Sequence, residues 1–194
     1  MTTRIERGTL LRVRLEPART TVAVVDVQEK LAKAMDEAAV ADLLRATTVL
    51  LEAARLLGAR VVATEQYPEG LGPTIGGVRE KLVEMKAPIL SKLAFAATDA
   101  EGFQAALGDA RSVVVVGMET HVCVYQTVRE LALRGVDVHV AIDGVASRRA
   151  DHKAAGIELM RACGASITTM ETVVFDWLRR AGTSEFKALS KLIR

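Results

Sequence analysis

Residues 113–127 read Val113-Val-Val-Val-Gly-Met-Glu-Thr-His-Val-Cys-Val-Tyr-Gln-Thr127. The run of valines predicts a strand that is buried on both faces. Gly117 ends this strand, and a helix is predicted from about His121 to Arg134, where Gly135 stops it. A buried strand followed directly by a helix is typical of βαβ units, so this stretch predicts a parallel sheet covered by helices.

The same alternation of strand and helix continues on both sides of this stretch. Apolar runs predict further strands at Thr21–Val25, Arg60–Thr64, Pro88–Ser91, Val136–Ile142 and Ser166–Thr169. Apolar residues that recur at helical spacing predict helices over Ala39–Leu57 and Asp151–Cys163 and at the C-terminus. Thr98 and Glu101 resemble a capping box, which predicts a further helix that ends near Gly108. Between strands two and three, Glu65 to Gly77 is rich in glycine and proline and is interpreted as a functional loop. We expect an α/β fold: a three-layer, doubly wound, mostly parallel six-stranded sheet of Rossmann-like type.

Length and composition indicate one globular domain over residues 1–194. The net charge of +2 and 4% aromatic residues give no basis for a nucleic-acid partner. No apolar run approaches the ~20 residues of a membrane-spanning helix. The segment from Met1 to Leu15 lacks the apolar core of a signal peptide and is interpreted as a lead-in to the first strand. Two cysteines, Cys123 and Cys163, suggest no disulfide framework, so a reducing, cytoplasmic location is expected.

Three reactive side chains lie at predicted strand ends. Asp26 ends the first strand, Lys92 follows the third, and Cys123 opens the helix after the fourth. Parallel strands bring their carboxyl ends to one edge of the sheet, where ligands bind. We therefore expect a carboxylate, an amine and a thiol to meet there, with Cys123 as a nucleophile whose thiolate is favoured by the helix amino terminus and by Lys92. Asp26 would be the general base.

The chain resembles the isochorismatase-like cysteine hydrolases from about Thr21 to Glu171. The residues that carry this resemblance are, in chain order, Asp26-Val27-Gln28, Thr64 to Thr74, Ser91-Lys92 and the stretch 113–127 quoted above. The loop Thr64-Glu-Gln-Tyr-Pro-Glu-Gly-Leu-Gly-Pro-Thr74 and the last helix are similar to those of the metal-free isochorismatase domain-containing proteins.

The resemblance implies hydrolysis of a small amide or ester-like substrate, without a cofactor, through an acyl-enzyme on Cys123. It also implies an oxyanion hole made by the backbone N–H groups of Glu119 and Cys123, with a cis peptide between Met118 and Glu119, and a homo-oligomer. Related nicotinamidases hold a metal through Asp and His residues after strand two. The matching residues here are Glu65-Gln66-Tyr67, and none of the three histidines of the chain lies in that loop, so no metal is expected.

Each candidate also has an ordinary structural interpretation. Cys163 is interpreted as an inert helix residue. Residues that could line or gate the pocket, or simply pack there, are Gln28, Glu65, Tyr67, Phe95 and His121. His121 stands two positions before Cys123, a spacing at which helical side chains do not face each other, so a Cys–His dyad is not expected. Two other functions stay open: a vinyl-ether hydrolase of isochorismatase type, and a non-catalytic binding or scaffold protein.

Overall fold

The computed structural model describes residues 12–193, so most of the lead-in from Met1 to Leu15 lies outside the described part. Its centre is a six-stranded sheet in the order β3-β2-β1-β4-β5-β6, and every neighbouring pair is parallel. The strands are β1 (Thr20–Val25), β2 (Arg60–Gln66), β3 (Ile89–Lys92), β4 (Ser112–Met118), β5 (Asp137–Ala146) and β6 (Ser166–Thr168). The chain order reverses between β1 and β4, which is the switch point of a doubly wound sheet.

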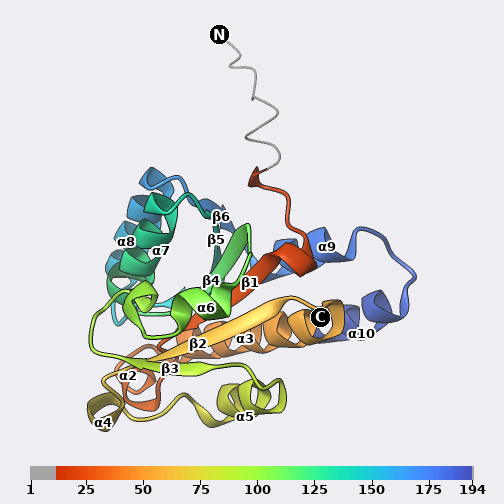
Figure 1. Ribbon diagram of the computed structural model, residues 1–194. Helices are drawn as coiled ribbons and strands as arrows, with labels where there is room; N and C mark the ends of the chain where they lie inside the picture. Colours follow the sequence, from red (N-terminus) through yellow and green to blue (C-terminus); the bar gives the residue numbers. More distant parts are fainter. Residues whose placement is uncertain (1–11, 194) are drawn as a thin grey trace.

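Helices cover both faces of the sheet, which confirms the predicted three layers (Figure 1). One face carries α3 (Glu37–Leu57), α5 (Gly76–Glu84), α9 (Met170–Leu178) and α10 (Ser184–Ile193); the other carries α6 (Phe103–Leu107), α7 (Tyr125–Leu133) and α8 (Ala150–Ala162). Short helical turns complete the chain at η1 (Pro17–Arg19), α2 (Glu29–Ala32), α4 (Pro68–Leu71), η2 (Ala97–Asp99) and a π-helical turn (Thr120–Val124). None of the helices among residues 12–193 combines the length and hydrophobicity that a membrane crossing needs.

The two central strands are buried on both faces because their apolar residues alternate between two cores. In β1, Val22 and Val24 pack toward α3, whereas Ala23 and Val25 pack toward α7. Every residue of β1 and of β4 is buried. This double burial explains why these strands are continuous apolar runs in the sequence.

The segment from Glu65 to Gly77 is not the loop that its glycines and prolines predicted. Glu65 and Gln66 extend β2, Pro68–Leu71 form α4, and α5 begins at Gly76. Proline is well accommodated in the first turn of a helix, as at Pro68, so its presence did not exclude helix here.

The capping box predicted at Thr98 was also wrong. Thr98 lies inside the turn η2, where its hydroxyl donates to Asp99, and the following helix α6 begins only at Phe103. Gly102, in the left-handed conformation, is the residue that precedes this helix.

Candidate active site

Asp26 lies at the switch point, directly after β1, and is fully buried. Its backbone has a φ of +52°, a left-handed conformation that aspartate tolerates better than most residues. The Asp26 amide still donates to the carbonyl of Thr64, at 3.1 Å, as a continuation of the β1–β2 ladder. The residue is therefore held at the strand end by its main chain.

Lys92, the last residue of β3, forms a buried ion pair with Asp26. Its Nζ lies 2.7 Å from Asp26 Oδ2, and the two side chains are 1% and 0% exposed. The ammonium also donates to Gln66 Oε1 at 2.8 Å and to the carbonyls of Ala94 and Phe95 at 3.2 and 3.0 Å. Thr64 Oγ1 donates to the other carboxylate oxygen of Asp26, at 2.7 Å. These hydrogen bonds hold the buried pair in one geometry.

Cys123 lies in the π-helical turn that follows β4, rather than in the first turn of a regular α-helix. Two glycines let the backbone come close at this place. A side chain at Gly117 would meet the Val25 carbonyl oxygen at 2.0 Å, and one at Gly156 of α8 would meet the main chain of Thr120 and His121 at 2.9 Å. The end of β4 thus lies close to β1, and the turn that follows it lies close to α8, so Cys123 comes to the edge where Asp26 lies.

The pKa of the Cys123 thiol is raised, contrary to the expectation of a lowered pKa. Burial, and after it the charge of Asp26 and a side-chain hydrogen bond to Asp26, together raise the pKa of this thiol to about 12. Lys92 acts in the opposite direction and lowers the pKa, but by less. Asp26 and Lys92 therefore both act on the thiol, and the effect of the carboxylate is the larger of the two.

We expect Cys123 to react slowly with iodoacetamide at neutral pH, despite its place in the site. A rise of the pKa from 9.0 to about 12 reduces the thiolate fraction about a thousandfold. Rates for Cys123 and Cys163 can be measured against pH by peptide mass spectrometry, with the half-buried Cys163 as the internal reference. A Cys123 that is the faster of the two at neutral pH would contradict this assignment of charges.

The main chain before Cys123 has the form that the resemblance implied. A cis peptide joins Met118 and Glu119. The Glu119 side chain is buried and accepts from the amide and the guanidinium of Arg148, at 3.0 and 3.1 Å. No carbonyl among residues 12–193 accepts a hydrogen bond from the Glu119 amide. The predicted oxyanion donor is therefore not engaged by the backbone.

Two predicted pocket residues belong to the framework around the site. Gln28 is fully buried: its amide donates to the carbonyls of Gln66 and Gly72, and its Oε1 accepts from the Gln66 amide. Glu65 accepts from Thr74 and from Arg79. Because these polar atoms are used within the protein, the structure places Gln28 and Glu65 behind the site, where they hold the segment after β2.

The other predicted pocket residues lie nearer the surface. Tyr67 and Phe95 are about half exposed, and Tyr67 lines a pocket of about 480 Å³ that reaches Lys92 and the exposed Leu93. Cys123 does not line this pocket. His121 is half-buried, and its Nδ1 lies 3.1 Å from Ser147 Oγ. The centre of its ring lies 4.6 Å from that of His152, with the two planes tilted by 45°.

Thr64, Gln66 and Thr127 were missed by the sequence analysis. Thr64 and Gln66 hold the Asp26–Lys92 pair, while Thr127 accepts from the Ala97 amide and donates to the Cys123 carbonyl, at 2.8 and 2.6 Å. The available signal was the polar carboxyl end of β2: Thr64, Glu65 and Gln66 follow the apolar residues of this strand and are buried, and buried polar groups need partners.

A metal centre was not expected, and this stays a prediction. Among residues 12–193, no three histidine, cysteine, aspartate or glutamate side chains gather in a geometry that could hold a metal ion. Glu65, the carboxylate in the position where related proteins hold a metal, is committed to Thr74 and Arg79.

A doubly wound α/β sheet with a thiol, a carboxylate and an amine at its switch point defines a class of candidate hydrolases. Residues 20–172 match the isochorismatase domain. The chain therefore belongs to the isochorismatase family.

Two relatives show this family by sequence. The chain is 34% identical over 185 residues to the secreted isochorismatase effector Isc1 of Phytophthora sojae, which covers 93% of this chain and 87% of the relative. It is 32% identical over 180 residues to isochorismatase domain-containing protein 1 of Salmo salar, with 93% of this chain covered. The match spans 62% of that longer relative.

Solved structures agree with the fold. The structure of the MAR1 ribonuclease of Caenorhabditis elegans is 34% identical, with a TM-score of 0.87 over 93% of this chain and 92% of that one. The YcaC gene product of Escherichia coli, described as an octameric hydrolase of unknown specificity, has a TM-score of 0.85 over 93% of this chain and 90% of that chain. At 20% identity, the YcaC likeness concerns the fold alone.

Proposed function

We propose that this protein is a cysteine hydrolase that cleaves a small amide or ester-like substrate through an acyl-enzyme on Cys123. The observation that carries the proposal is the buried Asp26–Lys92 pair, 2.7 Å long, whose charges act on the Cys123 thiol. A stability role alone accounts poorly for this pair, because burying two charges costs about as much as their attraction returns. A thiol, a base and a cation at one strand edge are the groups that acyl transfer requires.

In the first half-reaction, Asp26 takes the proton of Cys123 as the sulfur bonds to the acyl carbon. The high thiol pKa makes this base necessary, and Lys92 stabilises the thiolate as it forms. A carboxylate offers four lone-pair sites, so Asp26 can accept this proton while Thr64 and Lys92 stay bound. The carbonyl electrons move onto oxygen, where the amides of Glu119 and Cys123 would donate. Asp26 then returns the proton to the leaving amine or alcohol as its bond to carbon breaks.

Water completes the second half-reaction by the same route in reverse. Asp26 takes a proton from the water as its oxygen bonds to the thioester carbon. The carbon–sulfur bond breaks, the acid product leaves, and the proton passes from Asp26 to the Cys123 thiolate. The sum is the substrate plus one water giving an acid and an amine or alcohol, with the enzyme unchanged.

We expect Cys123→Ala to abolish hydrolysis, with a loss of about 10³-fold or more against an activated ester such as p-nitrophenyl acetate. Intact-protein mass spectrometry of the unchanged protein during turnover should show one acetyl group, which peptide mapping places on Cys123. Cys163→Ala is the matched control and should keep both the rate and the adduct. A Cys123→Ala variant with full activity would overturn the proposal.

The surface beside the cluster supports a small, partly apolar substrate. Tyr67, Leu93 and Phe95 expose large apolar side chains there, and the pocket of about 480 Å³ lies within the usual size of small-molecule sites. A panel of small primary amides and esters that differ in the acyl chain should therefore be tested first.

A vinyl-ether hydrolase is the second candidate, favoured by the name of the Phytophthora relative. Vinyl-ether hydrolysis needs proton transfer to carbon rather than a nucleophilic thiol. Isochorismate hydrolysis that survives in Cys123→Ala would therefore favour it.

Ribonuclease activity is a third candidate, suggested by the name of the Caenorhabditis neighbour. Cleavage of a single-stranded oligoribonucleotide by the unchanged protein and by the same variants tests this candidate. Cleavage that is unchanged in Cys123→Ala and in the Asp26 and Lys92 variants would show that the ribonuclease activity does not use this site.

Assembly into a homo-oligomer, which the resemblance to the family implied, is part of the proposal. A cytoplasmic location stays a prediction, since the Phytophthora relative is named as a secreted protein.

A further inference from the structure

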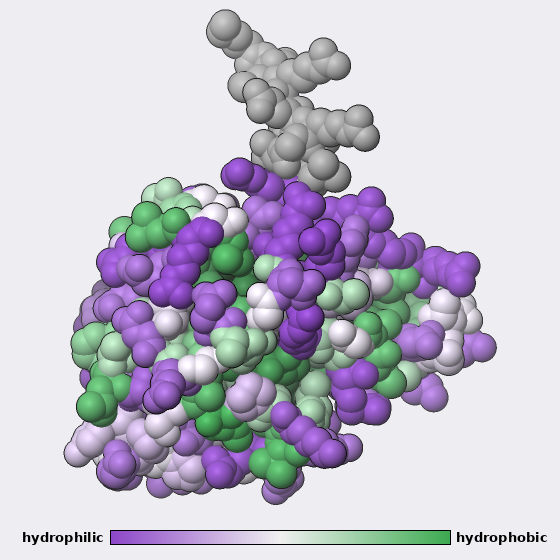
Figure 2. All heavy atoms as spheres, viewed as in Figure 1, coloured by the Kyte–Doolittle hydropathy of each residue, from purple (hydrophilic) through white to green (hydrophobic). Residues whose placement is uncertain are grey.

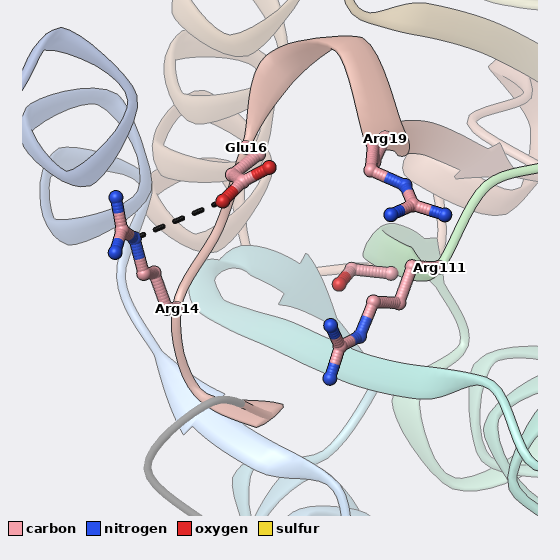
Figure 3. A pocket seen from close by; sticks show the side chains of 5 residues that line it. Arg14, Glu16, Arg19 and Arg111 are labelled. Atoms are coloured by element: carbon pink, nitrogen blue, oxygen red, sulfur yellow. Dashed lines mark ion pairs between the residues drawn. The ribbon is translucent and has the colours of Figure 1, made fainter.

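We propose that a second pocket, at the amino-terminal edge of the sheet, binds the phosphate group of a phosphate monoester. The pocket has a volume of about 50 Å³ and is lined by Arg14, Glu16, Arg19, Arg111 and Ser112 (Figure 3). It adjoins the starts of β1 and β4, whereas Asp26 and Cys123 follow the ends of these strands. A strand rises about 3.3 Å per residue, so the six residues of β1 separate the two sites by about 20 Å.

The sheet register forces two arginines together at this pocket. Thr20 pairs with Ser112 at the start of the β1–β4 ladder, so Arg19 and Arg111 precede paired positions. The Arg111 amide donates to the Arg19 carbonyl at 2.9 Å, which extends the ladder by one step. Arg19 ends η1 and Arg111 directly precedes β4, so two positive charges lie at neighbouring positions, and an anion between them would reduce their repulsion. Figure 3 shows both side chains on one side of the pocket, with Arg14 and Glu16 on the other.

The carboxylates of this region balance only part of its positive charge. Glu16 lies 3.9 Å from Arg14, and Asp137 is shared between Arg12 and Arg111, at 3.8 and 3.5 Å. Among residues 12–193, Arg19 has no carboxylate within 4.0 Å.

The next carboxylate, Asp109, is engaged by Arg60 at 2.6 Å. Four guanidinium groups thus meet two available carboxylates, which leaves two positive charges. Figure 2 shows the hydrophilic surface that gathers over this end of the molecule.

A phosphate monoester fits this charge and these donors better than a carboxylate does. Guanidinium groups bind phosphate oxygens through paired N–H donors, and the buried Ser112 lines the pocket with a hydroxyl that can donate to a further oxygen. A monoester carries nearly two negative charges at neutral pH, which matches the excess of two, while a carboxylate carries one. The small volume holds the phosphate alone, so the rest of the ligand would extend over the surface.

Calorimetric titration of the full chain with inorganic phosphate and with adenosine 5′-monophosphate tests the proposal, with adenosine as the ligand control. We expect both phosphates to bind with one site per chain and adenosine not to bind. Arg19→Gln and Arg111→Gln should each weaken binding about tenfold or more. Binding should also weaken as the pH falls below about 6, where the second phosphate proton returns.

Arg149→Gln is the matched control, because it removes the same charge from an exposed arginine near the start of α8, where Arg149 pairs with Asp151. It should leave phosphate binding unchanged. Equal losses in Arg149→Gln and Arg19→Gln would show general attraction of anions and overturn the site, as would no binding by the folded unchanged protein. Oligoribonucleotides with and without a 5′-phosphate distinguish the source of the phosphate. If the phosphorylated oligoribonucleotide binds more tightly than adenosine 5′-monophosphate, the ligand is a nucleic-acid end; if it does not, the ligand is a small metabolite.

Discussion

In an Asp26→Asn variant, hydrolysis should be lost while alkylation of Cys123 at neutral pH becomes faster than in the unchanged protein. The loss follows because the general base is removed, a change of about 10²- to 10⁴-fold. The gain follows because the Asp26 charge raises the thiol pKa and Lys92 lowers it. With a neutral amide at position 26, Lys92 becomes the available partner of a thiolate. Kinetics with p-nitrophenyl acetate and the pH dependence of iodoacetamide labelling measure the two effects.

The double variant Asp26→Asn with Lys92→Met provides the control for this result. It removes both charges, so burial and the charge of Glu119, which both raise the thiol pKa, remain, and alkylation should be slow again. The single variant also leaves a buried ammonium without its carboxylate, which costs about 3–5 kcal/mol, so thermal unfolding should accompany both assays. A folded Asp26→Asn protein whose Cys123 is alkylated no faster than before would contradict the proposed charges.

Gly117→Ala should unfold the protein or reduce its stability by more than about 4 kcal/mol. Gly117 has a φ of +139°, and a Cβ there would lie 2.0 Å from the Val25 carbonyl oxygen. That atom belongs to the backbone of a central strand, so it cannot move aside as a side chain end could. The clash separates β1 from β4 at the point where both arrive at the candidate site. Chemical denaturation of the variant and of the unchanged protein measures the difference.

Gly58→Ala isolates the steric part of this effect. Gly58 also has a positive φ, +79°, but nothing lies within 4 Å of an added Cβ. This variant meets only the conformational cost of a left-handed alanine, about 1–2 kcal/mol. Similar losses in the free energy of unfolding at the two positions would show that β1 and β4 can separate at Gly117 with little loss of stability.

The sheet could be predicted because its strands carry a strong signal. Both faces are buried along Val113 to Val116 and along Thr21 to Val25, so apolar residues are favoured on both sides of these strands. The segment after β2 lacked such a signal. Its helix α4 has only four residues and no buried residue, so it is too short to show a helical apolar period.

The members of the candidate site could be chosen from their places at strand ends, but their electrostatic balance could not. The expectation of a reactive thiolate rested on a regular helix amino terminus and on Lys92. The structure instead has a π-helical turn, and Asp26 and burial outweigh Lys92. Burial and long-range hydrogen bonds, such as that from Thr64 to Asp26, depend on how the whole chain packs.

The hydrogen bonds from Lys92 to the loop after β3 affect how the sequences of such proteins can diverge. The ammonium binds the main-chain carbonyls of Ala94 and Phe95, while the side chains of Leu93 and Phe95 are exposed. A carbonyl is present whatever residue occupies the position. Mutation can therefore exchange the side chains at 93 and 95 over evolutionary time without disturbing the buried charges. If the proposed site is correct, ligand preference can then change between descendants while the reaction chemistry is inherited.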